Sequence, residues 1–424
     1  MKKTHHVIGG GTIFHVRPHL ALSAPAYGKV ASLIHEVLTL GYPDEPSRLH
    51  LTRMAGGPAS LETNADVAKL IDEIVADAST GIIFMSAALC DFTGKITKRE
   101  FDGEGLATVY EPSGKDQPRL KTEAGEQMLL LTPADKLIGR IRKERKDIFL
   151  VGFKTTAGAS PDEQYMTGLK LLKSASCNLV LANDVHTRLN MVITPEQARY
   201  HETNDRYAAI RGLVDMAMLR SKLTFTRAAV EPGDAVAWDS PMVPASLRAV
   251  VDHCIKRGAY KPFMGSTVGH FAVKVDEKTF LTSRRKTDFN KLAQTGLVLV
   301  EADGPNTVIA HGFKPSVGGQ SQRIIFREHP NMDCIVHFHC PMKTGSQVPV
   351  RSQREFECGS HECGKNTSDG LAGFHDIKAV MLDQHGPNIV FNRDVDPQAV
   401  IAFIEENFDL GGRTDNVKDW VAYA

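Results

Sequence analysis

In the first half of the chain, continuous apolar runs alternate with segments whose apolar residues recur every three or four positions. Four of the runs predict buried strands, at residues 5–12, 81–92, 147–155 and 177–185. Three segments with the helical period lie among them, at residues 65–78, 133–145 and 163–175. This alternation predicts a doubly wound, Rossmann-like α/β fold, in which a parallel sheet carries helices on both faces.

The second half has a different pattern of apolar residues, which predicts many short strands and fewer helices. Helices are predicted at residues 245–260 and 397–408. Short strands are predicted at residues 270–275, 279–283, 296–303, 306–313, 334–339 and 378–391. The expected architecture is a second α/β domain whose sheet is mainly antiparallel and flanked by helices.

The segment "EPGDAVAWDSPMVPAS", residues 231–246, lies between the halves with these two patterns. It is rich in Pro, Gly and Asp and has no helical period, which is typical of a linker. A length of 424 residues suggests about two or three domains. We therefore expect domains at residues 1–230 and 231–424, with the boundary near 228–245.

The composition is that of a soluble globular enzyme, with 42% hydrophobic residues and 50 basic against 50 acidic side chains. No basic run predicts a nucleic-acid or membrane-surface partner. No window nears about 18 uninterrupted apolar residues, and the N-terminus does not have the pattern of a secretory signal. The odd number of cysteines, seven, is typical of reduced thiols. We expect a cytoplasmic protein that acts on small molecules.

Glycines and polar residues follow the predicted strands of the first domain, where ligands of doubly wound folds bind. Gly10, Gly11 and Thr12 form a turn whose backbone N–H groups favour a phosphate, although such a triplet also serves as a plain tight turn. Asn183 can donate to a carbonyl oxygen, and Asp184 can order a loop or Mg²⁺. The same pair can also simply cap a strand.

Five segments of the first half resemble the phosphopantothenoylcysteine synthetase family, in the same order and over roughly residues 5–228. They are "IGGGT", "SAALCDF", "LLLTPADKL", "FLVGFKT" and "KLLKSASCNLVLANDV". The resemblance implies a doubly wound, dimeric enzyme that activates a carboxylate with CTP, or in some members ATP, together with Mg²⁺ before forming an amide.

Carried over position by position, the resemblance assigns roles to individual residues. Gly10, Gly11, Thr12 and Arg17 would face the nucleotide phosphates. The remaining assignments are Asp91 and Lys95 near the nucleotide or substrate, Asn183 as the catalytic residue that holds the acyl-nucleotide, Asp184 beside it, and Arg206 in place of the family's lysine. The family's "GFxxET" reads "GFKTT" here, so its acidic residue is missing.

His337 and His339 lie two residues apart in a predicted strand. Residues i and i+2 of a strand point to the same face, so both imidazoles can reach one metal ion, while Phe338 packs on the opposite side. Buried histidines also occur without a metal, bonded to the backbone. A third imidazole, His385, ends an apolar run before Gly386, and three protein ligands with one open position are typical of catalytic zinc.

The segments "FREHPNMDCIVHFHCP" and "AVMLDQHGPNIVF" resemble the class II aldolase and adducin family, and the likeness extends over about residues 246–410. It implies that His337, His339 and His385 bind Zn²⁺, which polarises a substrate carbonyl. It also implies a phosphate site at Ser266, Gly269, Thr282, Ser283 and Ser316. Arg284 replaces a small residue of that site, and it either strengthens phosphate binding or belongs to a solvated turn.

The family's proton-transferring carboxylate has no counterpart where it is expected. Residues 317–320 read "VGGQ", and none of these side chains moves a proton. Glu355, Glu357 and His361, in a segment dense in functional groups, are the candidate substitutes. Cys358, His361 and Cys363 also suggest a second metal site, but their spacing matches no standard zinc pattern.

The sequence therefore predicts a zinc-dependent lyase domain fused to a nucleotide-dependent ligase-like domain. The reaction would be aldol cleavage, epimerisation or decarboxylation of a small phosphorylated or carboxylated sugar-like substrate. Two alternatives stay open: a catalytically altered, adducin-like metabolite-binding or scaffold protein, and an enzyme whose main reaction is carboxylate–amine ligation. Both families build sites between subunits, so we expect a homo-oligomer.

Overall fold

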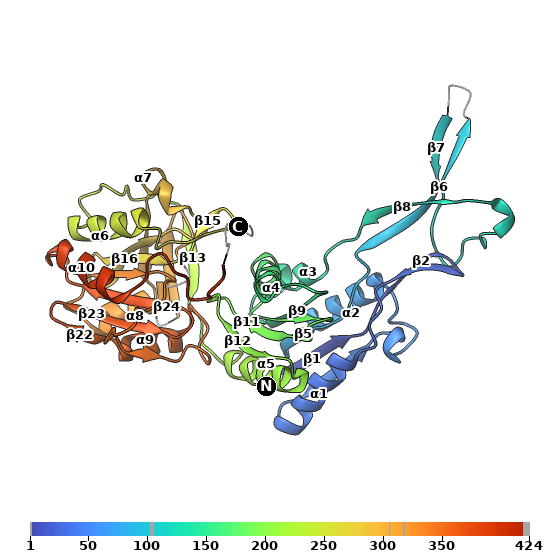
Figure 1. Ribbon diagram of the computed structural model, residues 1–424, viewed down its shortest axis with the longest axis horizontal. Helices are drawn as coiled ribbons and strands as arrows, with labels where there is room; N and C mark the ends of the chain where they lie inside the picture. The colour runs from blue at the N-terminus through green and yellow to red at the C-terminus, as the bar shows by residue number, and fades with distance from the viewer. Residues whose placement is uncertain (1, 102–105, 305, 317–318, 419–424) are drawn as a thin grey trace. The chain divides into compact units, whose positions relative to one another are not determined.

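The computed structural model describes residues 2–101, 106–304, 306–316 and 319–418 (Figure 1). The chain forms two compact units. The first comprises Met1–Ala159, Thr167–Val192 and His201–Ala217, and the second comprises Ser160–Met166, Ile193–Tyr200 and Met218–Ala424. The predicted domain limits of 1–230 and 231–424 stay a prediction about independently folding parts.

A seven-stranded sheet organises the first half of the chain, in the order β12-β11-β10-β9-β5-β1-β4. Its strands are β1 (Thr4–Gly9), β4 (Ser47–Leu51), β5 (Thr80–Met85), β9 (Phe149–Thr156), β10 (Leu179–Asp184), β11 (Asn190–Ile193) and β12 (Arg199–Thr203). From β4 through β1, β5 and β9 to β10, every neighbouring pair is parallel. The predicted parallel sheet is confirmed.

Five helices accompany this sheet: α1 (Lys29–Gly41), α2 (Asn64–Ala76), α3 (Ile138–Glu144), α4 (Pro161–Ala175) and α5 (Arg206–Arg220). Helix α2 begins with a capping box, because Thr63 accepts from the backbone of Asp66 and the Asp66 carboxylate accepts from the backbone of Thr63. Helix α3 is shorter than predicted, because Pro133 ends a strand and the helix starts only at Ile138.

Small antiparallel sheets follow β1 and β5. The strands β2 (Ile13–Arg17) and β3 (Leu20–Ser23) form a hairpin, and β6 (Phe92–Phe101) lies between β7 (Leu106–Tyr110) and β8 (Met128–Pro133) in an arm distinct from the parallel sheet (Figure 1). Single 3₁₀ turns occur at Arg53–Ala55 and Thr122–Ala124. Four consecutive apolar side chains of β8 are exposed, Met128, Leu129, Leu130 and Leu131.

The second unit is built on a larger sheet, in the order β13-β19-β18-β17-β16-β20-β24-β23-β21, with β22 also paired to β23. Its strands are β13 (Arg227–Glu231), β16 (His270–Lys274), β17 (Thr279–Ser283), β18 (Leu297–Ala302), β19 (Thr307–His311), β20 (Cys334–His337), β21 (Val350–Arg351), β22 (Ala372–Phe374), β23 (Ile377–Leu382) and β24 (Gly386–Phe391). Only the outer pairs β13–β19 and β21–β23 are parallel among the pairings described for it. The predicted mainly antiparallel sheet is confirmed.

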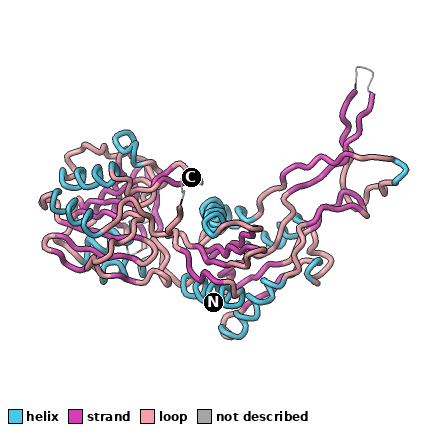
Figure 2. Tube along the Cα trace, in the orientation of Figure 1, coloured by secondary structure: helices cyan, strands magenta, loops and turns pink. Residues whose placement is uncertain are grey.

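Helices lie on this sheet, and a short hairpin, β14 (Pro262–Phe263) with β15 (Ser266–Thr267), stands beside it (Figure 2). The helices are α6 (Ala245–Lys256), α7 (Leu292–Thr295) after a 3₁₀ turn at Phe289–Lys291, α8 (Gly319–Glu328), α9 (His361–Gly370) and α10 (Pro397–Asn407). Helix α6 packs against α10, and α8 packs against α9. The strand-like segment at 378–391 forms a hairpin, because Gln384 and Gly386 take positive φ angles and turn the chain between β23 and β24.

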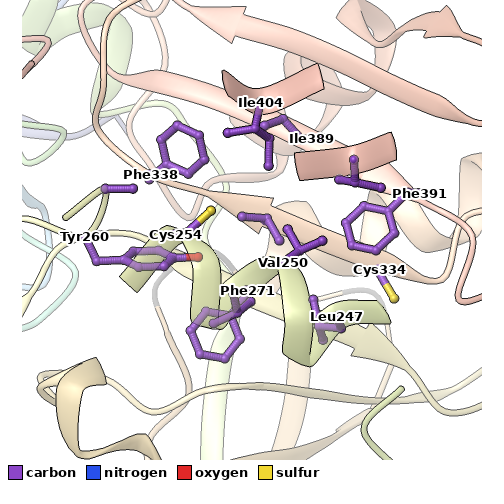
Figure 3. Close-up of a cluster of buried hydrophobic side chains, with 14 of the residues drawn as sticks. Leu247, Val250, Cys254, Tyr260, Phe271, Cys334, Phe338, Ile389, Phe391 and Ile404 are labelled. Atoms are coloured by element: carbon purple, nitrogen blue, oxygen red, sulfur yellow. The ribbon is translucent and has the colours of Figure 1, made fainter. Parts of the chain in front are cut away.

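One face of the sheet and the helices α6 and α10 enclose the larger core (Figure 3). Phe338 is fully buried there, edge-on to Tyr260 and Phe408 at ring-centroid distances of 6.4 and 5.9 Å. The prediction that Phe338 packs on the side of the strand opposite the histidines is confirmed. A second core, with Ile325 and Phe326 of α8, covers the other face.

Asp184 ends β10 and anchors the loop that follows. Its carboxylate accepts hydrogen bonds from the backbone N–H groups of Ala159, His186 and Thr187 at 2.9–3.0 Å and from the Thr156 hydroxyl at 2.8 Å. Burial by itself would raise the pKa of Asp184, but these hydrogen bonds outweigh it and hold the pKa well below its ordinary value. The charged carboxylate therefore stabilises the folded state.

No helix in the described part of the chain has the length and apolar character of a membrane span.

Replacing Phe338 with Ala should lower the free energy of unfolding of the second unit by about 3–5 kcal/mol, because the truncation leaves a cavity in a packed core. Urea unfolding followed by tryptophan fluorescence measures the change, since Trp238 lies in the same core. The control is Val350→Ala, at a side chain that is 54% exposed. Equal stabilities of the two variants would contradict the assigned core.

Replacing Asp184 with Asn should lower the melting temperature at pH 7, and the deficit should shrink as the pH falls. Because the folded-state pKa lies below the unfolded value of about 3.9, the wild-type advantage is present above that value and is lost as the pH drops through the folded-state pKa. Calorimetry between pH 7 and pH 3 measures this difference, with the exposed Asp44→Asn as the control. A deficit that does not change with pH would contradict a role for the charge.

Candidate functional site

Three histidines from distant parts of the chain converge in the second unit. The ligand atoms of His337, His339 and His385 all lie within 4.8 Å of one another, and the three side chains are buried. Their ring centroids are 5.1, 4.6 and 4.8 Å apart. Within the described residues, this is the one group of three or more His, Cys, Asp or Glu side chains close enough to share an ion.

Local backbone geometry brings the three rings together. His337 is the last residue of β20 and His339 follows it on the same face, whereas His385 sits in the turn between β23 and β24. Gly386 permits this turn: its φ is +150°, and a Cβ atom there would lie 2.1 Å from the carbonyl oxygen of Phe338. The close approach of this turn to the β20 end is therefore possible only with glycine.

The protonation of His337 suits a metal ligand. Its Nδ1 lies 2.8 Å from the carbonyl oxygen of Pro387. A carbonyl only accepts, so Nδ1 carries the proton and Nε2 keeps a lone pair for an ion. Burial lowers the pKa of His337 to about 4, which keeps the imidazole uncharged at neutral pH. Together with His339 and His385 it forms a set of three imidazole donors that fits Zn²⁺, which takes nitrogen ligands in tetrahedral sites with an open position.

The C-terminal segment passes over two of these histidines. The backbone N–H of Thr414 donates to the carbonyl of His339 at 3.4 Å, and its hydroxyl donates to the carbonyl of His385 at 3.2 Å. The next residue, Asp415, is buried, pairs with Arg413 at 2.8 Å and accepts from the Tyr165 hydroxyl at 3.2 Å. This buried cluster holds Thr414 against the backbone of the histidines.

A fourth histidine, His270, lies beside the centre and was not singled out from the sequence. It stands directly opposite His337 in the β16–β20 pairing, with ring centroids 4.7 Å apart. Gln322 of α8 contacts its Nδ1 at 2.8 Å, and both side chains are buried. Burial, together with the neighbouring His337, lowers the pKa of His270 well below its ordinary value. His270 and His337 could be recognised as neighbours only from the register of β16 and β20.

The residues predicted to bind phosphate lie on neighbouring turns of the same sheet. Gly269, with φ +121°, precedes His270, and a Cβ atom there would lie 2.6 Å from the carbonyl oxygen of His337. The Ser316 N–H donates to the Ser283 carbonyl at 3.0 Å, which brings those two turns together. The Ser283 hydroxyl is buried without a hydrogen-bond partner in the described part of the chain. These positions lie at strand ends around the histidines.

Three other predicted phosphate residues have local partners. The buried Thr282 hydroxyl donates to the carbonyl of Phe271 at 3.2 Å, and Ser266 donates to the carbonyl of Phe263 at 3.1 Å. Arg284 donates to the carbonyl of Thr295 at 2.7 Å and stacks on Phe313, 3.4 Å from the ring centroid. The stacking indicates that Arg284 helps to hold its turn.

The candidate acid–base residues lie between β21 and the first turn of α9. Glu355 accepts from the Ser352 hydroxyl at 2.9 Å. Glu357 is buried and interacts with the charge of Arg220. Burial and the positive charge of Arg323 lower the pKa of His361, so its imidazole is uncharged at neutral pH. Of the positions where the family carboxylate is expected, Val317 and Gly318 lie outside the described residues.

Arg220 organises the segment that carries these candidates. It is fully buried, pairs with the buried Glu196 at 3.0 Å, and donates to the carbonyls of Gln353 and Arg354 at 3.0 Å. Glu196 in turn accepts from the backbone N–H of Cys358. The fold therefore fixes the backbone of this segment.

The cysteines of that segment do not complete a second metal centre. The thiols of Cys358 and Cys363 contact each other, which is the main cause that lowers the pKa of Cys363. However, in the ranges that the structure describes, Cys358, His361 and Cys363 do not gather into a group that could hold an ion. The second metal site considered from the sequence is not supported.

In the first unit, close packing requires the glycine turn. A Cβ atom at Gly10 would lie 2.1 Å from the Thr52 hydroxyl, and one at Gly11 would lie 2.0 Å from the carbonyl oxygen of Ala24. Thr12 is buried, donates to Asn64 at 2.6 Å and accepts from the backbone of Cys90 at 2.9 Å. These bonds join the ends of β1 and β5 to the start of α2.

The remaining nucleotide candidates are divided between buried and exposed positions. Arg17 is buried and donates to Glu111 and to the carbonyls of Val16 and Pro112. Asn183, at the end of β10, accepts from the Thr155 hydroxyl at 3.2 Å, next to the anchored Asp184. The other three candidates are exposed: Asp91, which pairs with Lys136, Lys95 on β6, and Arg206 at the start of α5.

A cavity of about 630 Å³ opens directly after the glycine turn. Most of its lining residues were not predicted from the sequence. Its lining residues are Ile13, His15, Pro18, Arg53, Met54, Glu62 and Lys115. Glu62 is buried, pairs with Arg53 at 3.0 Å and with Lys115, and lies 3.4 Å from His15. Arg53 comes from a 3₁₀ turn and Lys115 from a loop, neither with a recognisable sequence motif, so only the fold brings them together.

Both halves of the chain are similar to known proteins. Residues 250–346 match the family model described as the Class II Aldolase and Adducin N-terminal domain. The chain is also 33% identical over 78 residues to the coenzyme A biosynthesis bifunctional protein CoaBC of Thermococcus kodakarensis. That match spans 18% of this chain and only 19% of the length of the relative.

Two solved structures are also similar. The DNA/pantothenate metabolism flavoprotein from Streptococcus pneumoniae is 20% identical, with a TM-score of 0.40, over 49% of this chain and 95% of that one. An L-fuculose 1-phosphate aldolase is 15% identical, with a TM-score of 0.30, over 39% of this chain and 85% of that one. The two family resemblances drawn from the motifs are confirmed: the chain joins a region similar to coenzyme A biosynthesis proteins to a class II aldolase-like region.

Proposed function

We propose that the second half of the chain is a zinc-dependent lyase domain that cleaves, epimerises or decarboxylates a small phosphorylated, sugar-like substrate. The observation that carries the proposal is the convergence of three buried imidazoles, His337, His339 and His385, within 4.8 Å. Imidazoles buried without an ion gain little from one another, whereas they form a ready donor set for a metal. When bound, zinc would polarise a substrate carbonyl and stabilise negative charge that develops next to it.

The chain's own residues supply orientation and substrate binding. The bond from Nδ1 of His337 to Pro387 fixes the ring so that Nε2 faces the site. The turns at Gly269, Ser283 and Ser316 lie at neighbouring strand ends, and the buried Ser283 hydroxyl has no hydrogen-bond partner in the described part of the chain. Such a hydroxyl supports a phosphate-binding role for these turns.

Glu355, Glu357 and His361 are proposed to supply the proton transfers. His361 is uncharged at neutral pH, as a general base must be. Helix α9, which starts at His361, packs on α8 so closely that a Cβ atom at Gly364 would lie 2.9 Å from Ser321. Ser321 is adjacent to Gln322, which contacts His270 beside the centre. This chain of contacts favours His361 over Glu357, which interacts with Arg220.

For the first half, we propose a nucleotide-dependent carboxylate–amine ligase activity that uses CTP or ATP with Mg²⁺. The partial identity to a coenzyme A biosynthesis protein supports it. The cavity beside the glycine turn offers Arg53, Lys115 and His15 for an anionic ligand. Asn183 and Asp184 sit at a parallel strand end, where ligands bind in such folds. Both halves would then act on small molecules.

The alternative is an adducin-like binding or scaffold protein. It is favoured by one observation, the sequence "VGGQ" where the family has its proton-transferring carboxylate. A domain that holds a metal and a ligand but cannot transfer a proton would bind the ligand without converting it to a product. Metal content and turnover, measured on the same protein, separate the two functions.

We further propose a homo-oligomer, formed through the arm of β6, β7 and β8. Met128, Leu129, Leu130 and Leu131 are 65%, 38%, 44% and 47% exposed, so apolar side chains of β8 face solvent on both sides of the strand. A second copy of the arm is apolar in the same way and would cover these residues. The seven cysteines are free, and six of them are buried, which fits the reducing cytoplasm that we propose as the location.

Purified protein should contain about one zinc per chain, and His337→Ala should lose it, because two imidazoles do not hold zinc tightly. Elemental analysis measures the metal. Retro-aldol turnover of a panel of phosphorylated sugars should fall by on the order of 100-fold or more in the same variant. The matched control is His35→Ala on α1, which should keep both properties.

Two results would sink the enzyme proposal. One is wild-type protein without stoichiometric metal, even after dialysis against zinc. The other is zinc-loaded protein that binds phosphorylated sugars in calorimetry but turns none of them over, which would establish the adducin-like alternative.

Replacing Met128 and Leu130 with Lys should dissociate the oligomer and lower its association constant by at least about 100-fold, because charged side chains at an apolar interface must be desolvated. Sedimentation velocity at several protein concentrations measures the change. Leu40→Lys, at a side chain 72% exposed on α1, is the control. Wild-type protein that sediments as a monomer at every concentration would refute the arm interface.

A further inference from the structure

Two cysteines lie at the start of α9, and neither has a role in the site described above. Cys363 lies in the first turn of the helix and is 2% exposed, whereas Cys358 precedes the helix and is partly exposed. The thiol of Cys358 donates a hydrogen bond to the sulfur of Cys363. The two sulfur atoms are therefore neighbours in the folded chain, and solvent reaches the side chain of one of them.

The backbone at the start of the helix holds the two cysteines in place. The Ser360 N–H donates to the carbonyl of Glu357 at 3.1 Å, which closes a turn over residues 357–360. Gly359 within this turn has a φ of +91°, a conformation that residues with a side chain rarely adopt. Ser360 then caps α9, and its hydroxyl accepts from the backbone N–H of Cys363 at 3.0 Å. The turn and the cap together fix where the two thiols lie.

Neighbouring groups favour a negative charge on the sulfur of Cys363. The hydrogen bond from Cys358 is the largest cause that lowers the pKa of Cys363. The amide nitrogen of Gln353 donates to the same sulfur at 3.4 Å, and the positive charge of Arg220 also lowers this pKa. Burial and the negative charge of Glu196 oppose them but do not outweigh them. Because the thiolate is the reactive form of cysteine, the fold favours reaction at this pair.

A second pair of neighbouring cysteines, Cys254 and Cys340, lies in an opposite environment. Both side chains are 0% exposed in the larger core. Burial raises the pKa of Cys340 to about 12, and burial together with Cys340 raises that of Cys254. Burial likewise raises the pKa of Cys177 to about 12. Such thiols stay protonated and out of reach of solvent, so they are chemically inert in the folded protein.

We propose that Cys358 and Cys363 form a reversible disulfide by exchange with disulfides of small thiols, which makes the start of α9 a redox-sensitive modification site. The pair is reduced in the structure, with both thiols in place for the bond. The disulfide requires neither a metal nor a sugar-like substrate, so it is independent of the proposed lyase function. His361, the residue favoured above for proton transfer, lies in the stretch that the disulfide would close.

The exchange balances with oxidised glutathione as the oxidant. The more exposed Cys358 loses its proton to water and attacks one sulfur of glutathione disulfide, whose S–S bond breaks and releases a glutathione thiolate. Cys363, as a thiolate, then attacks the Cys358 sulfur of the mixed disulfide, and the second glutathione leaves. Both glutathione thiolates take up protons from solvent. The two cysteines are oxidised, glutathione disulfide is reduced to its two thiols, and the same steps in reverse reduce the site.

The test uses the full chain, equilibrated in buffers with different ratios of oxidised to reduced glutathione. After an acid quench, the protein is denatured and alkylated, and its mass gives the number of thiols that had remained reduced. Reduced chains should carry seven alkyl groups and oxidised chains five, because two of the seven thiols are then joined. Peptide mapping should place the disulfide between Cys358 and Cys363, and dithiothreitol should restore all seven thiols.

Single variants test each partner of the pair. Cys363→Ala leaves Cys358 without a second thiol, so it should retain a mixed disulfide with glutathione. Cys358→Ser removes the more exposed thiol and should keep all its other thiols reduced at every ratio. Because that position is partly exposed, this variant still decides the question if Cys363→Ala fails to fold. The matched control is Cys177→Ala, at a buried thiol elsewhere, which should form the disulfide as the wild type does.

Three results would overturn the inference. One is wild-type protein that carries seven alkyl groups at every glutathione ratio. Another is a disulfide that maps to Cys254 and Cys340 or joins two chains. The third is a wild type that stops at the glutathione adduct, which would mean that Cys363 cannot reach Cys358. Zinc-free protein should give the same answer as zinc-loaded protein, so failure of this inference is distinct from failure of the proposed lyase function.

Discussion

The two-residue period of β20 and the residues that follow it is the constraint on which the second half depends. Phe338 points into the larger core, so His337 and His339 must point to the opposite face. Sliding this strand by one position would bury both imidazoles among the apolar residues of α6 and α10 and would turn Phe338 to the face that now carries the histidines. The burial of one phenyl ring therefore fixes the direction of two candidate metal ligands.

This dependence explains which parts of the fold and site could be predicted from the sequence. Alternating apolar patterns are local, and they predicted the parallel sheet, the mainly antiparallel sheet and the orientation of Phe338. His385 was found because it belongs to a recognisable turn with Gly386. In contrast, His270 became visible only when β16 was paired with β20, since strand register depends on residues far apart in the chain. Gln322 needed, in addition, the position of α8.

In the first half, the roles of glycines and charged residues are ambiguous in the sequence alone and depend on the three-dimensional structure. The triplet at Gly10 and Gly11 is required by contacts with Thr52 and Ala24, whether or not a phosphate binds. Arg17, a natural phosphate ligand by its chemistry, is buried and donates to Glu111 and to backbone carbonyls. The positive charge beside the turn comes instead from Arg53 and Lys115, whose side chains are 55% and 52% exposed at the cavity.

Buried polar groups of the second unit differ in whether the folded chain supplies their hydrogen-bond partners. That difference distinguishes groups that stabilise the fold from groups that could bind a ligand. Arg220 pairs with Glu196 and Arg413 pairs with Asp415, so these four buried charges have ion-pair partners within 3.0 Å, as a stable interior requires. The Ser283 hydroxyl and Gln322 Oε1 are buried acceptors without hydrogen-bond partners in the described residues. Because an unsatisfied group destabilises the ligand-free protein, it persists where a ligand completes it.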